Sequence, residues 1–546
     1  MKRFALILAL ALAPSWAGAA TIEVNAGPIN ADTHWTADNQ YLIKGGVYVT
    51  AGHTLTIDPG TIIRAEDGQL ENVSFLCISQ GAKINAVGTP SKPIIFTSKY
   101  DTDLNSTTDV SAFQTGLWGG LLICGKATTN NANKVQTMEG VPATWTFTNS
   151  GGDDDRDNSG TIKYVSIRHT GIVFAPNKEL QGLTLCGVGD GTTIDYVESY
   201  ASKDDGVELF GGTVNIKHLV VAFCEDDGID TDEGNRSKFQ FCFTIQSTGT
   251  GNDCLTETDG GVAPEDALPW AVPQMYNCTF LGTGVAGPAT ETKIGMHLRD
   301  NTAGVWANNI FGDLSGQFLY IETPSSGQGS VDRVKDGTLV FRNNLIFNVK
   351  AGSTLPAVCM VKGTEAAYTS DMLTANANAI EDPRLGSISR QSDRNLNPIP
   401  AQDGPAFSNL AAYPADSFFD KVSYKGAFGT SNWMLGWTAL DSYGFLKQGT
   451  TVAVKDDVPA AFNLVNNYPN PFNPSTTISF TVAKRGEVKL SVYDVTGRKV
   501  ATLVNGVQTP GAYSINWNAR GLGSGTYLCV LEHGSAKVSH KMTLLK

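Results

Sequence analysis

The sequence lacks the short motifs that mark several large enzyme classes. It has no GxSxG, HExxH or GxxxxGK[ST] pattern, and its nine cysteines form no CxxC or CxxCH pair. Nucleophile-elbow hydrolases, zincin proteases, P-loop proteins, zinc ribbons, thioredoxin-type redox sites and covalent haem are therefore unsupported. Charged residues are also sparse, at 17% of the chain, whereas the 58 glycines favour β-structure with many turns.

Long apolar runs are missing everywhere except at the N-terminus. No later run approaches the roughly 20 residues that a membrane-spanning helix needs. The first residues have a basic start at Lys2 and Arg3, an apolar stretch, and small residues at Ala17 and Ala19. This pattern predicts a secretory signal peptide over residues 1–19, cleaved after Ala19 or Ala20. We therefore expect an exported mature chain without a membrane span.

Positive charge is scarce in the body of the chain and concentrated at its C-terminal end. From Phe462 onward there are nine Lys or Arg and three Asp or Glu, which gives this segment a net charge of +6. The whole chain has a net charge of −13, so the residues before Phe462 have a net charge of −19. An acidic body disfavours nucleic acid and anionic lipid surfaces as partners, and it favours divalent cations.

Two neighbouring segments repeat one pattern. TIDYVESYASKDDGVELFGG aligns with TVNIKHLVVAFCEDDGIDTDEG at an offset of 22, which pairs Ile194 with Ile216 and superposes the two DDG triplets. TIKYVSIRHTG, from Thr161, is an earlier copy displaced by an insertion. Short strands that recur at one length without helices between them predict stacked coils, because a single coil cannot bury its inner face. The expected fold class is all-β, a right-handed parallel β-helix.

Asparagine recurs at the edges of apolar strands, in YNCTF at Tyr276, ANNIF at Ala307 and RNNLIF at Arg342. Asn tolerates the left-handed backbone of a tight corner, and stacked Asn amides can form a ladder. Near the end of this body, Trp433 and Trp437 have the spacing of an apolar cap over the last coil, with sugar stacking as the alternative. Cys186, Cys224 and Cys242 lie in apolar strands and are expected in the core, with disulfide pairing left open.

The segments GHTLTIDPGTIIRAEDG, AKINAVGTPSKPIIFTS, GLWGGLLICGKA, DDGVELFGG and DDGIDTDEG together resemble bacterial exported and surface proteins with a pectin-lyase-like β-helix. The resemblance covers roughly Thr21 to Leu446. It implies a β-helix domain with a C-terminal cap over residues 20–446, followed by a linker over 447–461. Such a fold hosts many activities and often none, so the resemblance leaves the function open.

Residues 462–546 have the features of a separate small domain. TTISFTV, EVKLSVYDV and TYLCVLE alternate apolar with polar residues between Gly and Pro turns, which predicts an immunoglobulin-like β-sandwich. NYPNPFNPST, DVTGRKV and the basic end KVSHKMTLLK resemble the type A sorting domain of type IX secretion substrates. The resemblance implies type IX secretion machinery as a partner, a secreted or outer-membrane cell-surface location, and attachment to a surface glycolipid.

The acidic repeats are the main candidate site. An offset of one coil places equivalent side chains about 4.8 Å apart, and a like-charged pair at about 5 Å costs on the order of 3 kcal/mol. Compensation could come from Ca²⁺, from basic neighbours, or from a proton held by one carboxyl. The candidate basic neighbours are Lys203, Arg236, Lys238 and Arg168. The candidate Ca²⁺ ligands are Asp204, Asp205, Glu208, Asp226, Asp227 and Asp230.

An enzyme remains the alternative to a structural, adhesive or envelope-associated protein. Asp205, Asp226 and Asp227 match part of the pattern of galacturonan hydrolases, and Arg236 could act as the base of a calcium-dependent polysaccharide lyase. The hydrolase pattern is incomplete, because TGTGNDC one coil later contains no His and His297 lies too far along the chain. The GGDDDRDNSG loop at Gly151 is only a loose match to a calcium loop. A surface glycolipid or an extracellular polysaccharide is the expected partner besides the secretion machinery.

Overall fold

The computed structural model describes residues 20–546 apart from 69–71, 139–140, 176–177, 250–251, 262–265, 288–293, 323–327, 362–365, 449–451, 455–462, 483–485, 509–510 and 535. The predicted signal peptide, residues 1–19, and most of the predicted linker lie outside the described residues. The only element within that linker range is β35 (Val452–Val454), among the residues described.

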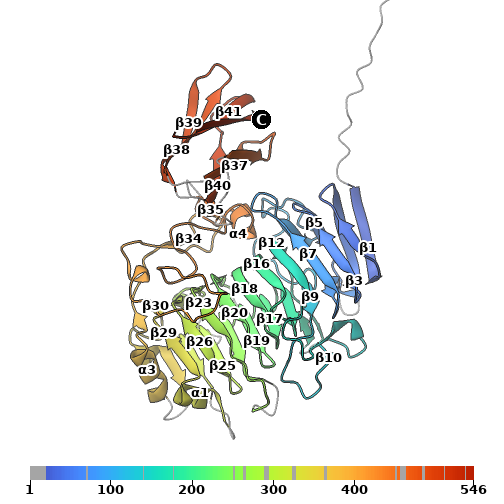
Figure 1. The fold of residues 1–546 in the computed structure, drawn as a ribbon, viewed down its shortest axis with the longest axis vertical. Helices are drawn as coiled ribbons and strands as arrows, with labels where there is room; N and C mark the ends of the chain where they lie inside the picture. The colour runs from blue at the N-terminus through green and yellow to red at the C-terminus, as the bar shows by residue number, and fades with distance from the viewer. Residues whose placement is uncertain are drawn as a thin grey trace, which may run out of the picture.

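A solenoid of parallel strands forms the body of the protein, and it confirms the predicted β-helix (Figure 1). In the part of the chain that the structure describes, 28 strands join into one continuous sheet that winds through three faces, A, B and C. Face A contains the ends of β1 (Ala20–Ile29) and β3 (Asn39–Val49), then β6 (Phe75–Ile78), β9 (Leu121–Cys124), β15 (Leu183–Cys186), β17 (Val207–Phe210), β19 (Ile229–Asp232), β22 (Thr256–Asp259), β25 (Met296–Arg299), β28 (Leu319–Ile321) and β31 (Cys359–Val361).

Face B and face C share three long strands that bend at the corner between them. These are β12 (Gly160–Arg168), β16 (Thr193–Tyr200) and β18 (Asn215–Ala222). Face B adds β2 (Thr33–Trp35), β4 (Thr54–Ile57), β7 (Lys83–Val87), β20 (Lys238–Gln240), β23 (Gln274–Tyr276), β26 (Gly304–Ala307) and β29 (Leu339–Arg342). Face C adds the starts of β1 and β3, then β5 (Ile62–Ala65), β8 (Ile94–Ser98), β21 (Phe243–Ile245), β24 (Thr279–Leu281), β27 (Ile310–Leu314), β30 (Leu345–Val349) and β32 (Ala379–Ile380).

The strand register follows the repeat in the sequence. Ile194 pairs with Ile216 and Val197 with Leu219 on neighbouring coils, as predicted from the offset of 22 residues. Alternate side chains of each strand point inward, where they stack into one apolar core that runs the length of the solenoid. The side chains between these core residues therefore point outward, to the surface of the solenoid.

Asparagines hold the corner between faces B and C, and they confirm the predicted ladder. Asn309, Asn344 and Asn378 are buried, and each side-chain carbonyl accepts a hydrogen bond from the backbone N–H of the preceding coil, at 2.8–3.1 Å. The residues just before the first two, Asn308 and Asn343, have the predicted left-handed backbone, with φ of 57° and 53°. In each NN pair, one residue turns the chain while the other joins the coils.

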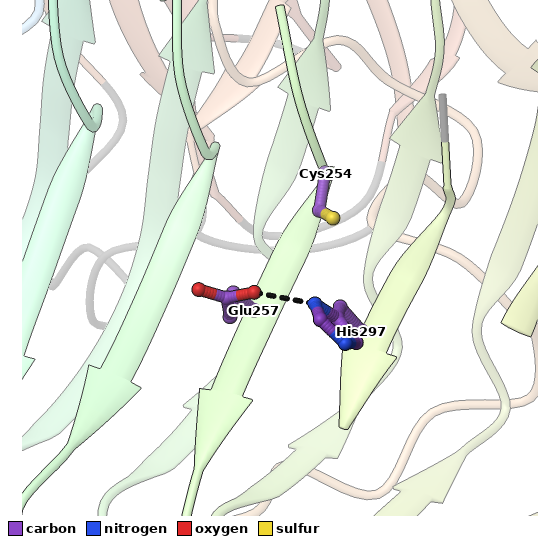
Figure 2. Close-up of side chains that lie close together, drawn as sticks. All are labelled: Cys254, Glu257 and His297. Carbon is purple, nitrogen blue, oxygen red and sulfur yellow. Dashed lines mark hydrogen bonds and ion pairs between the residues drawn. The ribbon is translucent and has the colours of Figure 1, made fainter. Parts of the chain in front are cut away.

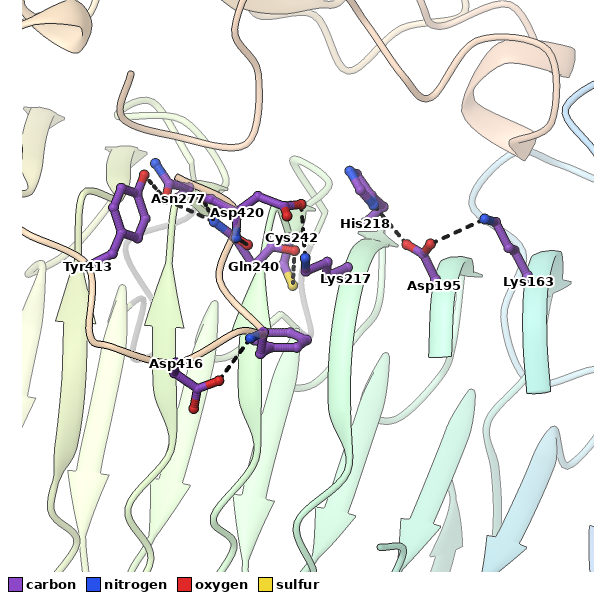
Figure 3. A network of polar contacts seen from close by, with 11 residues as sticks. Lys163, Asp195, Lys217, His218, Gln240, Cys242, Asn277, Tyr413, Asp416 and Asp420 are labelled. Carbon is purple, nitrogen blue, oxygen red and sulfur yellow. Dashed lines mark hydrogen bonds and ion pairs between the residues drawn. The ribbon is translucent and has the colours of Figure 1, made fainter. Parts of the chain in front are cut away.

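A segment that we call the strap, residues 405–446, runs back along the solenoid over face C and this corner (Figure 3). Lys217 donates to Asp420 at 2.9 Å, and Lys238 forms an ion pair with Asp416. The Asn308 side chain bonds both the N–H and the C=O of Ala411, at 2.7 and 3.1 Å. The backbone of the strap is thus hydrogen-bonded by an asparagine side chain of the corner.

The prediction that Trp433 and Trp437 cap the last coil is wrong. Trp433 packs on His218 with ring centroids 5.1 Å apart, and Trp437 packs on Tyr164 at 5.8 Å. Both partners belong to earlier coils, Tyr164 to β12 and His218 to β18, and not to the last coil. Both indoles are buried, so they cannot stack on a sugar. The aromatic side chains along the outer edge of face C explain the difference, because they would otherwise be exposed.

Short helices cover the last coil instead. α3 (Ala366–Ala375) packs on β29 and β31, and its Leu373 is buried in the solenoid core. The other helices are α1 (Ser330–Asp336), α2 (Leu355–Val358) and α4 (Ala439–Ser442), and 3₁₀ turns occupy Thr146–Thr148 and Pro405–Phe407. α3 therefore supplies the end cap that a solenoid requires.

Among the described residues of the body, three small antiparallel pairs lie outside the solenoid sheet. They pair β10 (Gln136–Thr137) with β11 (Asn149–Ser150), β13 (Ile172–Ala175) with β14 (Lys178–Leu180), and β33 (Leu385–Ser387) with β34 (Asn397–Pro400). The first two cover the outer side of early face A, where Met138 and Ile172 join an apolar cluster with Phe210. All nine cysteines are free thiols, and Cys186, Cys224 and Cys242 are buried as expected.

The C-terminal domain is the predicted antiparallel sandwich. One sheet has the order β35-β40-β37-β36 and the other β39-β38-β41-β42. Its strands are β36 (Asn463–Tyr468), β37 (Ser475–Val482), β38 (Gly486–Asp494), β39 (Lys499–Gln508), β40 (Gly511–Asn518), β41 (Gly525–His533) and β42 (Ala536–Leu544). The two sheets enclose a core of their own, which includes Phe480, Trp517 and Leu531.

Candidate functional site

The six predicted carboxylates gather on the outer side of face A, and we call them the acidic column. They are Asp204, Asp205, Glu208, Asp226, Asp227 and Asp230. In β17, Val207 and Leu209 point into the core, so Glu208 between them points outward. Glu208 lies in register with Asp230 on the next coil, and Asp230 with Glu257 on the coil after it. The one-coil offset therefore stacks acidic side chains, as predicted.

The DDG turns join neighbouring coils through their second aspartate. Asp205 Oδ1 accepts a hydrogen bond from the Asp227 backbone N–H at 3.0 Å, and Asp227 Oδ1 accepts one from the Cys254 N–H at 2.6 Å. Asp205, Asp227 and Cys254 thus occupy equivalent positions on three successive coils, and the third of these positions has a cysteine in place of an aspartate. These carboxylates have a structural task that is independent of any ligand.

Burial makes the acidic column costly. Removal from water raises the pKa of Asp205 well above its usual value, and the nearby carboxylates Glu208 and Asp204 raise it further. The pKa values of Asp227 and Asp230 are raised well above normal for the same reasons, burial first and neighbouring carboxylates second. The arrangement requires a positive charge or a proton to offset this accumulation of negative charge.

Two groups of three carboxylates bring their oxygens close enough to share one ion. Oxygens of Asp205, Glu208 and Asp230 lie within 4.8 Å of one another, and so do those of Asp204, Asp205 and Asp226. Asp230 is only 8% exposed, and its Oδ1 is buried without a hydrogen-bond partner. Carboxylate oxygens in this number suit Ca²⁺, which takes six to eight oxygen ligands in flexible geometry.

The basic residues named as candidate neighbours have other partners. Arg236 donates to Asp155 at 2.8 and 3.0 Å, and Lys203 donates to Glu225 at 3.1 Å. Lys238 is bound to Asp416 of the strap, and Arg168 lies beneath the strap against the ring of Tyr443. Asp155 belongs to the GGDDDRDNSG loop, so that loop holds Arg236.

One basic residue that sequence reasoning missed does act on the column. Arg299, on β25, contacts Glu257 at 3.0 Å and Asp259 at 2.5 Å, and its charge opposes the upward shift in the pKa of Asp230. His297 lies in register with Glu257 and hydrogen bonds it at 2.6 Å (Figure 2). The galacturonan-hydrolase pattern has its His on the coil after the Asp pair, which here is the coil of β22. His297 lies one coil further, on β25, but in register with Asp230 and Glu257. A register count that allowed for the long connections after β22 and after β24 would have found both residues.

The enzyme alternative is supported by part of this geometry only. The Asp205 carboxylate contacts the Asp227 backbone on the next coil, which agrees with the hydrolase pattern, and Asp226 belongs to the same acidic group as Asp205. Arg236, the proposed base, is held against Asp155. Arg299 is held against Glu257 and Asp259 in the same way.

Comparison with known protein families identifies both parts of the chain. Residues 27–386 match the family described as a pectate-lyase like beta helix domain, and residues 466–544 match a secretion system C-terminal sorting domain. No curated protein matches the chain. Among the described helices, none combines the length and the apolar character needed to cross a bilayer.

Proposed function

Because the chain belongs to the pectate-lyase-like β-helix family and ends in a secretion-system sorting domain, we propose that it is a calcium-stabilised structural or adhesive protein of the cell surface. The sorting domain makes it a secreted or cell-surface protein. The proposal concerns its role there: the acidic column binds Ca²⁺ and stiffens the solenoid, whose outer faces contact envelope polysaccharide.

One observation carries this proposal. Asp230 Oδ1 is buried without a hydrogen-bond partner beside Asp205 and Glu208. An unpaired buried carboxylate oxygen costs several kcal/mol unless a cation or proton compensates it. A single Ca²⁺ between neighbouring coils would contact all three carboxylates and offset two of their three negative charges, and it would link β17 to β19 in addition to their backbone hydrogen bonds.

Calcium removal should destabilise the protein. We expect the melting temperature of the mature chain to fall in EDTA and to recover on addition of Ca²⁺. Ca²⁺ at one hundred times its dissociation constant should add about 2.7 kcal/mol to the free energy of unfolding. Differential scanning calorimetry at fixed pH measures both effects.

Mg²⁺ is the matched control for calcium. It demands near-octahedral geometry and keeps its water, so equal concentrations should recover less of the lost stability. The Asp153→Asn variant removes an exposed carboxylate outside the column and should keep the full calcium response. A melting temperature that does not change with EDTA would refute the calcium part of the proposal.

The second candidate function is cleavage of acidic polysaccharide, which the family match and the adjacency of Asp205 and Asp227 favour. Our proposal predicts no release of unsaturated or reducing sugar ends when the protein is incubated with a panel of acidic polysaccharides, with and without Ca²⁺. Release by the natural protein that disappears in the Asp227→Asn variant would establish the enzyme instead.

Attachment to a surface glycolipid stays a prediction based on the sorting domain. The mass of the mature protein, isolated from the cell surface of a host with type IX secretion, distinguishes attachment from release. Removal of the sandwich together with an added glycolipid mass would indicate attachment.

A further inference from the structure

A second group of metal-ligating side chains lies next to the acidic column and differs from it chemically. Cys254, Glu257 and His297 each offer one ligand atom, and these three atoms lie within 4.8 Å of one another (Figure 2). Cys254 follows the turn that leads into β22, Glu257 lies on β22, and His297 on the neighbouring β25. Two coils of the solenoid therefore supply one sulfur, one oxygen and one nitrogen.

These donors suit a different ion from the one proposed for the acidic column. Sulfur and imidazole ligands select transition metals such as Zn²⁺, whereas Ca²⁺ takes only oxygen ligands. Burial raises the pKa of the Cys254 thiol well above its usual value, and the carboxylates of Asp227 and Asp253 add to this effect. Without a metal, Cys254 is thus an unreactive thiol.

The surroundings already hold the two ligands of β22 and β25 in position. Glu257 Oε1 accepts the hydrogen bond from His297 Nδ1, and Glu257 Oε2 contacts Arg299 at 3.0 Å. The His297 ring stacks on Tyr320 with centroids 4.8 Å apart, and its Nε2 is buried without a hydrogen-bond partner. Partners of this kind around a metal site fix the orientation of the ligands and tune their basicity.

We propose that Cys254, Glu257 and His297 form a transition-metal site that prefers Zn²⁺ to Ca²⁺. Binding through Nδ1 releases the thiol proton of Cys254 to solvent, shifts the ring proton of His297 from Nδ1 to Nε2, and replaces the direct contact between His297 and Glu257 with a bridge through the ion. Water would complete the tetrahedral coordination that Zn²⁺ favours. The site would join β22 to β25 beyond the point where the acidic column ends.

Cobalt(II) tests the proposal because it gives a thiolate-to-metal charge-transfer absorption when cysteine is a ligand. We expect the full-length mature chain, freed of metal by chelation, to bind one Co²⁺ with this absorption, and Zn²⁺ to displace it. Excess Ca²⁺ should leave the absorption unchanged. Arg299→Gln, which releases Glu257 from its partner, should weaken Co²⁺ binding about 10- to 100-fold.

Substitutions separate this site from other thiols and from the acidic column. Cys254→Ser should abolish the charge-transfer absorption while circular dichroism shows an intact fold. Cys278→Ser, which removes another buried thiol, should retain it. Glu208→Gln should reduce the calcium response and keep the cobalt absorption, so the two proposals can fail independently. Absence of the absorption in the natural protein, or its persistence in Cys254→Ser, would overturn the proposal.

Discussion

Replacing Glu198 with alanine is expected to lower the free energy of unfolding by about 3–5 kcal/mol, because it leaves buried polar groups without compensation. The Glu198 carboxylate is fully buried, and it accepts hydrogen bonds from the Ala439 and Leu440 N–H groups of the strap at 2.6 and 3.2 Å. It also accepts one from Ser166 at 2.6 Å, and Ser166 in turn accepts from the buried Arg168 at 2.8 Å. Urea unfolding followed by circular dichroism measures the loss.

The same substitution at Glu23 is the control. Glu23 is exposed and pairs with Lys44 at 2.7 Å, so its removal should cost less than about 1 kcal/mol. Limited proteolysis provides a second measurement, since the Glu198→Ala variant should be cut within the strap sooner than the natural protein. Equal stability of the two alanine variants would show that Glu198 does not hold the strap.

Replacing Asp230 with asparagine is expected to have the opposite effect in calcium-free buffer. At a pH high enough to ionise Asp230, whose pKa is raised well above normal by burial and neighbouring carboxylates, the variant should be more stable than the natural protein by about 3 kcal/mol, the cost of one like-charged pair at about 5 Å. The amide removes a charge from a buried group of carboxylates, and its N–H atoms can donate to Asp205 or Glu208. The same variant should lose most of the calcium response, because one ligand is missing. Calorimetry with and without Ca²⁺ measures both changes.

Asp230→Ala is the matched variant for that experiment. It removes the same charge without adding a donor, so it should gain less stability than asparagine while losing calcium binding equally. If Asp230→Asn is less stable than the natural protein in calcium-free buffer, the carboxylates do not repel one another and the calcium proposal loses its physical basis.

The repeat in the sequence carried most of the information about the fold. An offset of 22 residues places Ile194 over Ile216 and Glu208 over Asp230, because one coil of that length returns each strand to the same face. The Asn corner followed from a local property, since asparagine accepts a left-handed backbone and its amide can bond the next coil. Local and periodic signals of this kind need no knowledge of distant contacts.

The contacts that sequence reasoning missed depend on packing between distant segments. Nothing local to Trp433 indicates that it packs on His218 rather than over the last coil, because both positions would bury an indole equally well. Arg299 escaped notice because the 40 residues between Glu257 and His297 conceal the repeat. Longer connections between strands, such as the one between β22 and β23, preserve the register in space but not in sequence.

The strap also affects when the protein can finish folding. Glu198 accepts a hydrogen bond from the backbone N–H of Ala439, 241 residues further along the chain. Asp101 accepts one from the hydroxyl of Tyr443, 342 residues away. Contacts between residues so far apart form late, because a long loop must close before any stabilisation is gained. A nascent chain that has made its early coils therefore still lacks the hydrogen bonds that the strap donates to these acids. Such a chain stays less stable until its last coils and strap emerge.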